Sequence, residues 1–203
     1  MADLSGYTAL TETHGSFTAA DVIDKYTAIV ETCLVGQSHL HQRTGDEVMI
    51  VSTSPGDLIS TAMMIIQNTS KEDNFLQVHG GLHYGKILKR NNHYFGNTIN
   101  ITSRIVSKAT PGTFWCSEAY INALSDRTSF TFLPKGKHRF KNISEETEMY
   151  ELFITGLESF SIDPVCRMLL NKKDNLIPHP AEENIFFCSQ NCLNIYINNN
   201  IYS

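Results

Sequence analysis

The sequence predicts an α+β fold, with one main domain followed by a small cysteine-containing module. Two segments carry apolar residues at helical spacing, and short strand-like runs bounded by glycine and proline turns alternate with them. The composition then changes after Phe153, because residues 162–203 hold three of the five cysteines. A chain of 203 residues can bury one substantial core, so we expect one main domain.

The order of the elements follows from apolar spacing and turn residues. Apolar side chains every three or four residues predict a helix over 19–34, with Thr18 as its cap, and another after Pro55. The run 75–86 is the candidate for the central strand, and Thr44-Gly45-Asp46 indicates a hairpin turn. The other predicted elements are a strand ending within 3–8, strands over 38–42 and 47–52, a helix over 97–108, a strand over 113–116, a short helix from Ser117, and strands over 130–133, 138–141 and 149–153.

Charge and composition exclude several classes of function. The net charge is −5 and there is no dense Lys/Arg tract, so we expect neither nucleic acid nor a membrane surface as a partner. No apolar run approaches the roughly 18 residues of a membrane span, and no basic start precedes an apolar run, which predicts a cytoplasmic protein. The odd number of cysteines favours buried thiols at Cys33 and Cys116, plus a metal cluster, over a disulfide framework.

Two carboxylates stand beside glycine turns. Asp3 lies in Met1-Ala2-Asp3-Leu4-Ser5-Gly6-Tyr7-Thr8, and Asp46 follows Gly45 at the predicted hairpin tip. Either residue alone is an ordinary cap or turn residue. Brought together, however, they could hold a divalent metal pair for phosphate chemistry. In the run 94–104, Asn100 and Arg104 are four residues apart, hence on one face of a helix.

In combination, these motifs resemble the class III adenylate/guanylate cyclase catalytic domain, over residues 2–153. Five residues of catalytic type occur in the order and at approximately the separations of that family: Asp3, Asp46, Asn100, Arg104 and Lys141. The resemblance implies a ferredoxin-like (βαββαβ-type) core that works as a homodimer, with both sites at the interface. It also implies that a nucleoside triphosphate is converted to a 3′,5′-cyclic nucleotide and pyrophosphate, for intracellular signalling.

Each of these residues has an expected role. Asp3 and Asp46 would bind Mg²⁺ or Mn²⁺, and the turn Leu4-Ser5-Gly6-Tyr7-Thr8 would present backbone amides to the phosphates. The side chain of Asn100 would orient the ribose and Arg104 would hold the α-phosphate. Lys141 would contact the terminal phosphates.

The chain departs from the family at the base-reading positions and at its first strand. Adenylate cyclases read the base with Lys and Asp or Thr, and guanylate cyclases with Glu and Cys, where this sequence has Gln42 and His93. ATP is favoured over GTP only by its frequency in the family. The family's first strand begins several residues earlier, which would put Asp3 at a frayed end. Either the true start lies upstream, or a truncated first strand loosens the metal site and exposes the centre of the sheet.

A second resemblance covers residues 162–203, after a linker over 154–161. The runs Asp163-Pro164-Val165-Cys166-Arg167-Met168 and Phe186-Phe187-Cys188-Ser189-Gln190-Asn191-Cys192 are similar to the YHS domain, and an Asn-rich tail follows. Arg167 replaces a usual Gly and is expected to strain a turn. Cys166, Cys188 and Cys192 could bind zinc or a soft metal such as copper, with Asp163 or His179 as the fourth ligand.

Three functions are consistent with these patterns. The favoured one is a cyclase, a phosphorus-oxygen lyase that makes cyclic AMP rather than cyclic GMP. The alternatives are a catalytically weak or inactive nucleotide-binding regulator, and a metal-binding or metal-sensing protein that acts through its C-terminal module. A nuclease or polymerase has no support, since a basic face for nucleic acid is missing.

Overall fold

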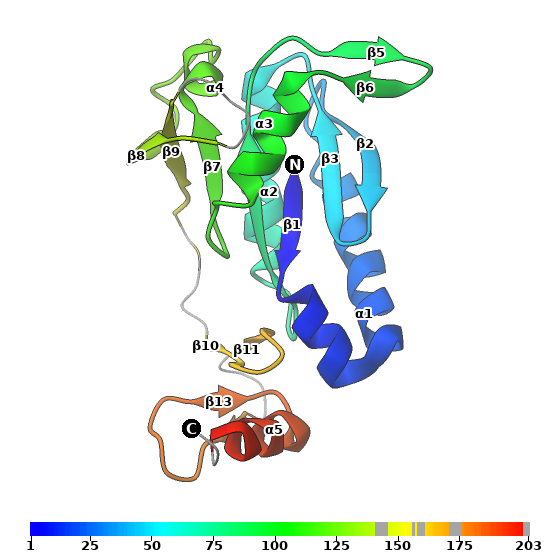
Figure 1. Cartoon of the computed structure of the whole chain (residues 1–203), viewed down its shortest axis with the longest axis vertical. Helices are drawn as coiled ribbons and strands as arrows, with labels where there is room; N and C mark the ends of the chain where they lie inside the picture. Colours follow the sequence, from blue (N-terminus) through cyan, green and yellow to red (C-terminus); the bar gives the residue numbers. More distant parts are fainter. Residues whose placement is uncertain (141–145, 156, 158–160, 171–175, 201–203) are drawn as a thin grey trace.

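The chain forms a mixed seven-stranded sheet with helices on both faces and a smaller C-terminal segment at one end (Figure 1). The computed structural model describes residues 1–140, 146–155, 157, 161–170 and 176–200. The main-sheet order is β2-β3-β1-β4-β7-β9-β8, in which β4 and β7 are parallel and the other neighbours antiparallel. The elements are β1 (Ala2–Ser5), α1 (Tyr7–Thr32), β2 (His39–Thr44), β3 (Glu47–Val51), α2 (Pro55–Thr69), β4 (Gln77–Leu82), β5 (Leu88–Arg90), β6 (His93–Phe95), α3 (Asn97–Val106), β7 (Phe114–Ser117), α4 (Glu118–Asn122), β8 (Thr131–His138), β9 (Thr147–Phe153), β10 (Ser161–Ile162), β11 (Leu169–Leu170), β12 (Ile177–Pro178), β13 (Phe186–Phe187) and α5 (Gln190–Asn200).

The sheet is packed between α2 on one face and α3 on the other (Figure 1). The predicted apolar face of α2 is confirmed, since Ile59, Ile65 and Ile66 are buried in the core. The predicted central strand is confirmed as β4, the fourth of the seven strands. A side chain at Gly81 of β4 would bring its Cβ within 2.9 Å of Ile105, so glycine allows α3 to approach this closely.

Helix α1 begins much earlier than the spacing predicts. The start at residue 19 and the Thr18 cap are wrong, because the helix starts at Tyr7, directly after Gly6, and the Thr18 hydroxyl donates to the carbonyl of His14. Gly15 (φ 83°, ψ 167°) breaks the helix into two halves, 7–14 and 16–32, at a steep angle (Figure 1). The first half was missed because it packs against the C-terminal segment, which is distant in sequence.

Two further elements differ from the prediction. The strand expected over 130–133 is part of a longer strand, β8, whose pairing with β9 shifts register between Pro134 and Gly136. The separate strand expected over 138–141 is wrong where the structure describes it, because only His138 belongs to β8, and residue 141 lies outside the described residues. The β5–β6 hairpin was not predicted. It turns through Asn91 and Asn92, both at positive φ, which is the conformation that a two-residue hairpin turn requires.

The C-terminal segment packs against the end of the sheet and α1. The Leu169 amide donates to the Phe75 carbonyl at 2.7 Å, and Met168 forms a bridge with Leu76. The Asn-rich tail is helical over most of its length, as α5. None of the described helices has both the length and the apolar character needed to cross a bilayer.

Candidate active site

Strand β1 and the β2–β3 hairpin bring Asp3 and Asp46 together. Alternation along β1 buries Ala2 and Leu4 in the core and turns Asp3 to the opposite face, while Asp46 sits in the hairpin turn. The two carboxyl groups are close enough for the charge of Asp46 to act on Asp3. Asp3 is paired with His79 of β4, and the neighbouring Ala2 with β3, so the expectation of a frayed end is wrong.

Asp3, Asp46 and Glu47 form an acidic group that favours the binding of a cation. Burial, the charge of Asp46 and then the charge of Glu47 raise the pKa of Asp3 from 3.8 to about 7. Oδ1 of Asp3 is buried and has no hydrogen-bond partner within the described residues. An unpartnered carboxylate oxygen beside a second carboxylate fits a hard divalent metal such as Mg²⁺ or Mn²⁺. Glu47 is a third acid that the sequence analysis missed, since it follows Asp46 directly and reads as a strand residue.

His79 and Tyr26 border this acidic group. Nδ1 of His79 lies 2.8 Å from the Ser5 hydroxyl. Burial lowers the pKa of His79, and the charge of Asp46 opposes that shift. The Tyr26 hydroxyl is buried without a partner among the described residues, and its pKa is raised well above the usual value by burial and then by the nearby charges of Asp3 and Asp46.

The predicted phosphate turn directly follows Asp3. Leu4 is buried and anchors the turn, Ser5 ends β1, and Gly6 adopts the left-handed conformation (φ 93°) before the first helical residues Tyr7 and Thr8. The amides of the first helical turn have no acceptor within the helix, and the N-cap residue Gly6 has no side chain to cap them. The turn and the acidic group therefore lie side by side, and together they favour a phosphate group with its bound metal ions.

Asn100 and Arg104 lie on the exposed face of α3. The opposite face of α3 packs on the sheet through Ile105. Within one chain, nothing in the described residues brings either side chain to Asp3. Lys141, the other residue of catalytic type, lies outside the described residues.

Gln42 of β2 and His93 of β6 line the same small cavity, of about 190 Å³. Glu47 and Tyr94 also line it, and Nε2 of Gln42 donates to the Thr44 hydroxyl at 3.0 Å. The two positions expected to read a base are thus brought together although they come from separate strands.

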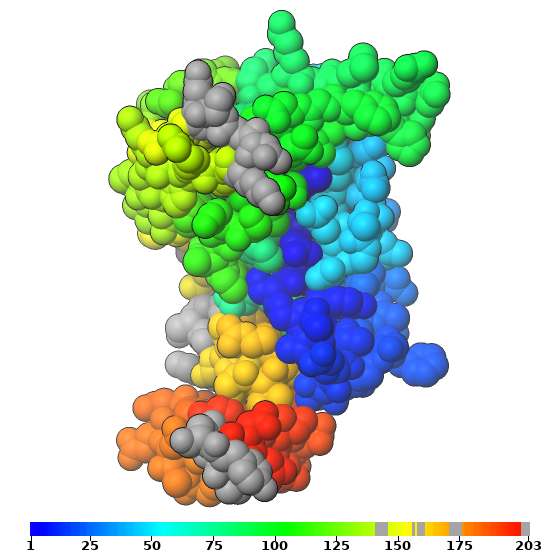
Figure 2. Space-filling model, in the orientation of Figure 1, coloured from blue at the N-terminus to red at the C-terminus, as the bar shows by residue number. Residues whose placement is uncertain are grey.

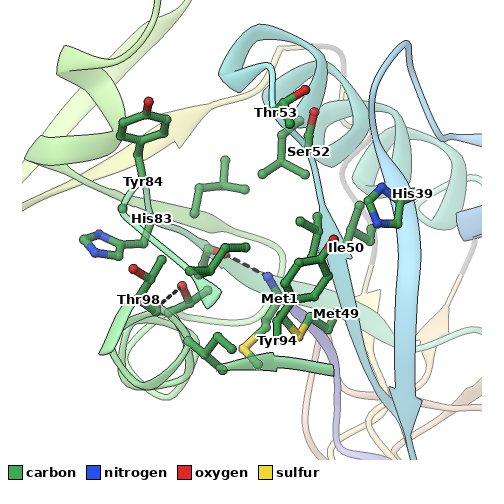
Figure 3. Close-up of a pocket in the computed structure, with 18 of the residues that line it drawn as sticks. Met1, His39, Met49, Ile50, Ser52, Thr53, His83, Tyr84, Tyr94 and Thr98 are labelled. Atoms are coloured by element: carbon green, nitrogen blue, oxygen red, sulfur yellow. Dashed lines mark hydrogen bonds between the residues drawn. The ribbon is translucent and has the colours of Figure 1, made fainter. Parts of the chain in front are cut away.

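A larger cleft, of about 720 Å³, lies between β3 and β4 beyond Met1 (Figure 3). Its wall is largely apolar, with Met49, Ile50 and Tyr94 beside polar groups such as His83. No residue of the acidic group or of the Asn100/Arg104 face lines this cleft. The carboxylates rather than cavity size therefore mark the candidate site.

The three C-terminal cysteines converge on a fourth donor that the sequence did not suggest. Ligand atoms of His14, Cys166, Cys188 and Cys192 all lie within 4.8 Å of one another. The expected fourth ligands, Asp163 and His179, are wrong.

Both of those side chains are engaged elsewhere. The carboxylate of Asp163 accepts hydrogen bonds from the amides of Val165 and Cys188, and Nδ1 of His179 accepts from the amide of Glu182.

All five cysteines are free, and Cys33 and Cys116 are buried as expected. Arg167 has a φ of 67°, which agrees with the strained turn expected where a glycine is usual.

Comparison with known proteins identifies the family. The profile of the adenylate and guanylate cyclase catalytic domain matches residues 1–155. The chain therefore belongs to this family.

Sequence relatives agree with the family, but the match with this chain covers only part of each relative's length. An uncharacterized protein of Mycobacterium tuberculosis is 35% identical over 113 residues, which are 55% of this chain and 30% of that protein. An adenylate cyclase of Glutamicibacter nicotianae is 30% identical over 131 residues, or 64% of this chain and 32% of that protein. The chain thus spans about a third of the length of these curated relatives.

Solved structures share the fold. Adenylate cyclases from Trypanosoma brucei, described in their monomeric state, superpose with a TM-score of 0.69 at 20% identity, covering 78% of this chain and 90% of theirs. The guanylate cyclase domain of RhGC from Catenaria anguillulae, in complex with GTP, gives a TM-score of 0.57 at 17% identity, covering 75% and 93%. The main domain therefore has the mixed α+β fold of cyclase catalytic domains.

Proposed function

We propose that this chain is the catalytic unit of a nucleotidyl cyclase, which converts a nucleoside triphosphate to a 3′,5′-cyclic nucleotide and pyrophosphate. The single observation that carries the proposal is the acidic pair of Asp3 and Asp46, with one unpartnered carboxylate oxygen, next to the uncapped start of α1. A triphosphate needs both features, cations held by carboxylates and amides directed at phosphate oxygens.

Asp3 and Asp46 are the residues that would hold two divalent metals, Mg²⁺ or Mn²⁺, with Glu47 adding negative charge nearby. Such metals would acidify the 3′ hydroxyl and neutralise charge on the phosphates. Asp3 must be ionised to bind a cation, so its raised pKa makes metal binding depend on pH near neutrality.

The remaining residues position the substrate. The turn from Leu4 to Thr8 binds phosphate oxygens through backbone amides. Asn100 orients the ribose and Arg104 holds the α-phosphate, where negative charge grows in the transition state. Lys141 binds the terminal phosphates.

The chain acts as a homodimer, with metal carboxylates from one protomer and the Asn100/Arg104 face from the other. Support comes from the exposure of both side chains on α3, away from the acidic group of their own chain. Each dimer then carries two equivalent sites.

Gln42 and His93 contact the base. Their shared cavity supports this role, and their side chains can each donate or accept a hydrogen bond, so they suit an adenine or a guanine edge. ATP is the proposed substrate on family frequency.

The proposed organisation is a ferredoxin-like cyclase domain over 1–153, a linker over 154–161 and a YHS-like module over 162–203. Within the first domain, the strand order β2-β3-β1-β4 with antiparallel neighbours supports a βαββαβ core.

Cyclic nucleotide formation from ATP and from GTP, with Mn²⁺ present, tests the proposal. Purified protein is compared with Asp46→Asn, which removes one metal carboxylate, and with Asp21→Asn, a control that removes an exposed carboxylate on α1. We expect product from the natural chain and the control, and a loss of about 100-fold or more in Asp46→Asn. Folded, dimeric protein that makes no product from either nucleotide would refute the proposal.

A nucleotide-binding regulator without turnover is the second candidate. The base-reading positions favour it, because Gln42 and His93 match neither the adenylate nor the guanylate pattern. Tight binding of ATP or GTP without product, measured by calorimetry, would support the regulator over the enzyme.

A further inference from the structure

The C-terminal segment and the first half of α1 meet at a cluster of four potential metal ligands. Nε2 of His14 lies 3.5 Å from Sγ of Cys188 and 3.6 Å from Sγ of Cys192. Sγ of Cys188 lies 3.5 Å from the sulfurs of both Cys166 and Cys192. A disulfide needs about 2.05 Å between sulfurs, so these are separate thiols that surround a common centre.

The spacing fits a tetrahedral zinc ion. With Zn–S of about 2.3 Å and Zn–N of about 2.0–2.1 Å, the edges of a tetrahedron are about 3.8 Å between sulfurs and about 3.6 Å between nitrogen and sulfur. The distances from His14 to Cys188 and Cys192 match the second value, and the sulfur contacts are a few tenths of an ångström short of the first. Three thiolates and one imidazole form a common structural zinc ligand set.

Backbone hydrogen bonds hold the cysteines in place. The buried carboxylate of Asp163 accepts from the amide of Cys166 at 3.1 Å and from the amide of Cys188 at 2.8 Å, which joins two segments 22 residues apart. The Ser189 hydroxyl accepts from the amide of Cys192 at 3.2 Å at the start of α5. Cys166 and Cys192 are fully buried, so their thiols converge in a preorganised site away from water.

The cluster is tied to the proposed phosphate turn at two points. His14 is on the half-helix 7–14, whose first turn follows Gly6, and about 10 Å of helix separates the two. Arg167, next to Cys166, packs directly on Gly6, since a Cβ added there would lie 2.4 Å from Cβ of Arg167. Figure 2 shows the dark blue start of the chain lying against the yellow-orange and red atoms of the C-terminal segment.

We propose that His14, Cys166, Cys188 and Cys192 bind one zinc ion, and that this ion clamps the C-terminal segment onto the half-helix that carries the phosphate turn. Binding displaces a proton from each thiol and involves no change of oxidation state. Zinc then favours the ordered arrangement of Gly6 and Arg167, and its loss loosens the turn. The zinc site is independent of the proposed function, whereas its effect on nucleotide binding rests on it.

Metal content and cobalt spectroscopy of the full-length protein test the site without nucleotide. We expect one zinc per chain after purification under reducing conditions, and Co²⁺ substitution should give the intense visible bands of tetrahedral coordination with thiolate charge-transfer bands. His14→Ala should lose or markedly alter this spectrum, and His14→Cys should restore tetrahedral bands with stronger charge transfer. His179→Ala, a histidine of the same segment outside the cluster, should leave the spectrum unchanged.

Two results would overturn the proposal. One is folded, reduced protein that binds neither zinc nor Co²⁺ at the cysteines. The other is a His14→Ala spectrum identical to that of the natural chain, which would confine any metal to the C-terminal segment and remove the clamp.

The clamp itself is measured by hydrogen exchange and by kinetics. Zinc should protect residues 7–14 and 161–170 from exchange in the natural chain but not in His14→Ala. If the cyclase proposal holds, zinc removal should raise KM for the nucleotide about 5-fold or more, while His179→Ala leaves it unchanged. Absence of cyclase activity would leave the exchange result intact, whereas unchanged exchange would refute the clamp even in an active enzyme.

Discussion

Asp3 makes the folded protein less stable when no cation is bound, and Asp3→Asn should reveal this. Burial and the charges of Asp46 and Glu47 raise the pKa of Asp3 from 3.8 to about 7. Between these values the folded state holds a proton that the unfolded state has lost. The free energy of unfolding therefore falls as pH rises from about 4 to about 7, and the loss persists above that range. Replacing Asp3 with the similarly shaped, neutral Asn removes the penalty.

The magnitude follows from the pKa shift. A shift from 3.8 to about 7 corresponds to about 4 kcal/mol for a fully buried group at 1.36 kcal/mol per unit. Because Asp3 is only half-buried, solvent screening reduces this, and we expect Asp3→Asn to be more stable by about 2 kcal/mol at pH 8. At pH 5 the difference in the free energy of unfolding between Asp3→Asn and the natural chain should fall to less than about 1 kcal/mol, since Asp3 is then largely protonated in the natural chain.

Urea unfolding at pH 8 and pH 5 measures this difference in the free energy of unfolding at each pH. The buffer contains neither Mg²⁺ nor Mn²⁺, and no chelator. Asp21→Asn is the control, because its exposed carboxylate should give no pH-dependent gap. Adding Mn²⁺ at pH 8 should stabilise the natural chain and leave Asp3→Asn almost unchanged. If Asp3→Asn were no more stable than the natural chain at pH 8, or if the gap did not depend on pH, the electrostatic account of this site would be refuted.

Three further variants test separate parts of the site. Gly6→Ala places a side chain at φ 93° and against Arg167, so it should lower the free energy of unfolding by about 2 kcal/mol and weaken nucleotide binding; unchanged thermal unfolding would contradict this. Tyr26→Phe removes a buried hydroxyl without a partner among the described residues and should raise the free energy of unfolding by up to about 1 kcal/mol at pH 8, whereas a clear loss would show that the hydroxyl is bonded. Gln42→Lys combined with His93→Asp should raise kcat/KM for ATP relative to GTP about tenfold or more; an unchanged ratio would remove these residues from base recognition.

The sequence patterns predicted the features that depend on residues close together in the chain. The meeting of Asp3 and Asp46 was anticipated through the resemblance to the cyclase family, because either residue alone is an ordinary cap or turn residue, whereas the helical face containing Tyr26 was evident from apolar spacing. The proximity of the Tyr26 hydroxyl to Asp3 and Asp46 could not be anticipated, since helix spacing does not reveal which strand ends lie near the buried hydroxyl.

Contacts between distant parts of the chain could not be predicted. His14 meets Cys188 across 174 residues, and no local spacing links them. The start of α1 was missed for the same reason, because the half-helix before Gly15 packs against a segment at the other end of the chain.

The most direct test of the central claim is complementation between two inactive variants. Asp46→Asn lacks a metal carboxylate and Arg104→Ala lacks the transition-state cation, and each homodimer should be almost inactive. If each site takes these groups from different protomers, a mixed dimer contains one site with both defects and one intact site. Equal mixing after subunit exchange should therefore recover about a quarter of the natural cyclase activity. Verified mixed dimers with no activity above the separate variants would contradict a cyclase site shared across a homodimer.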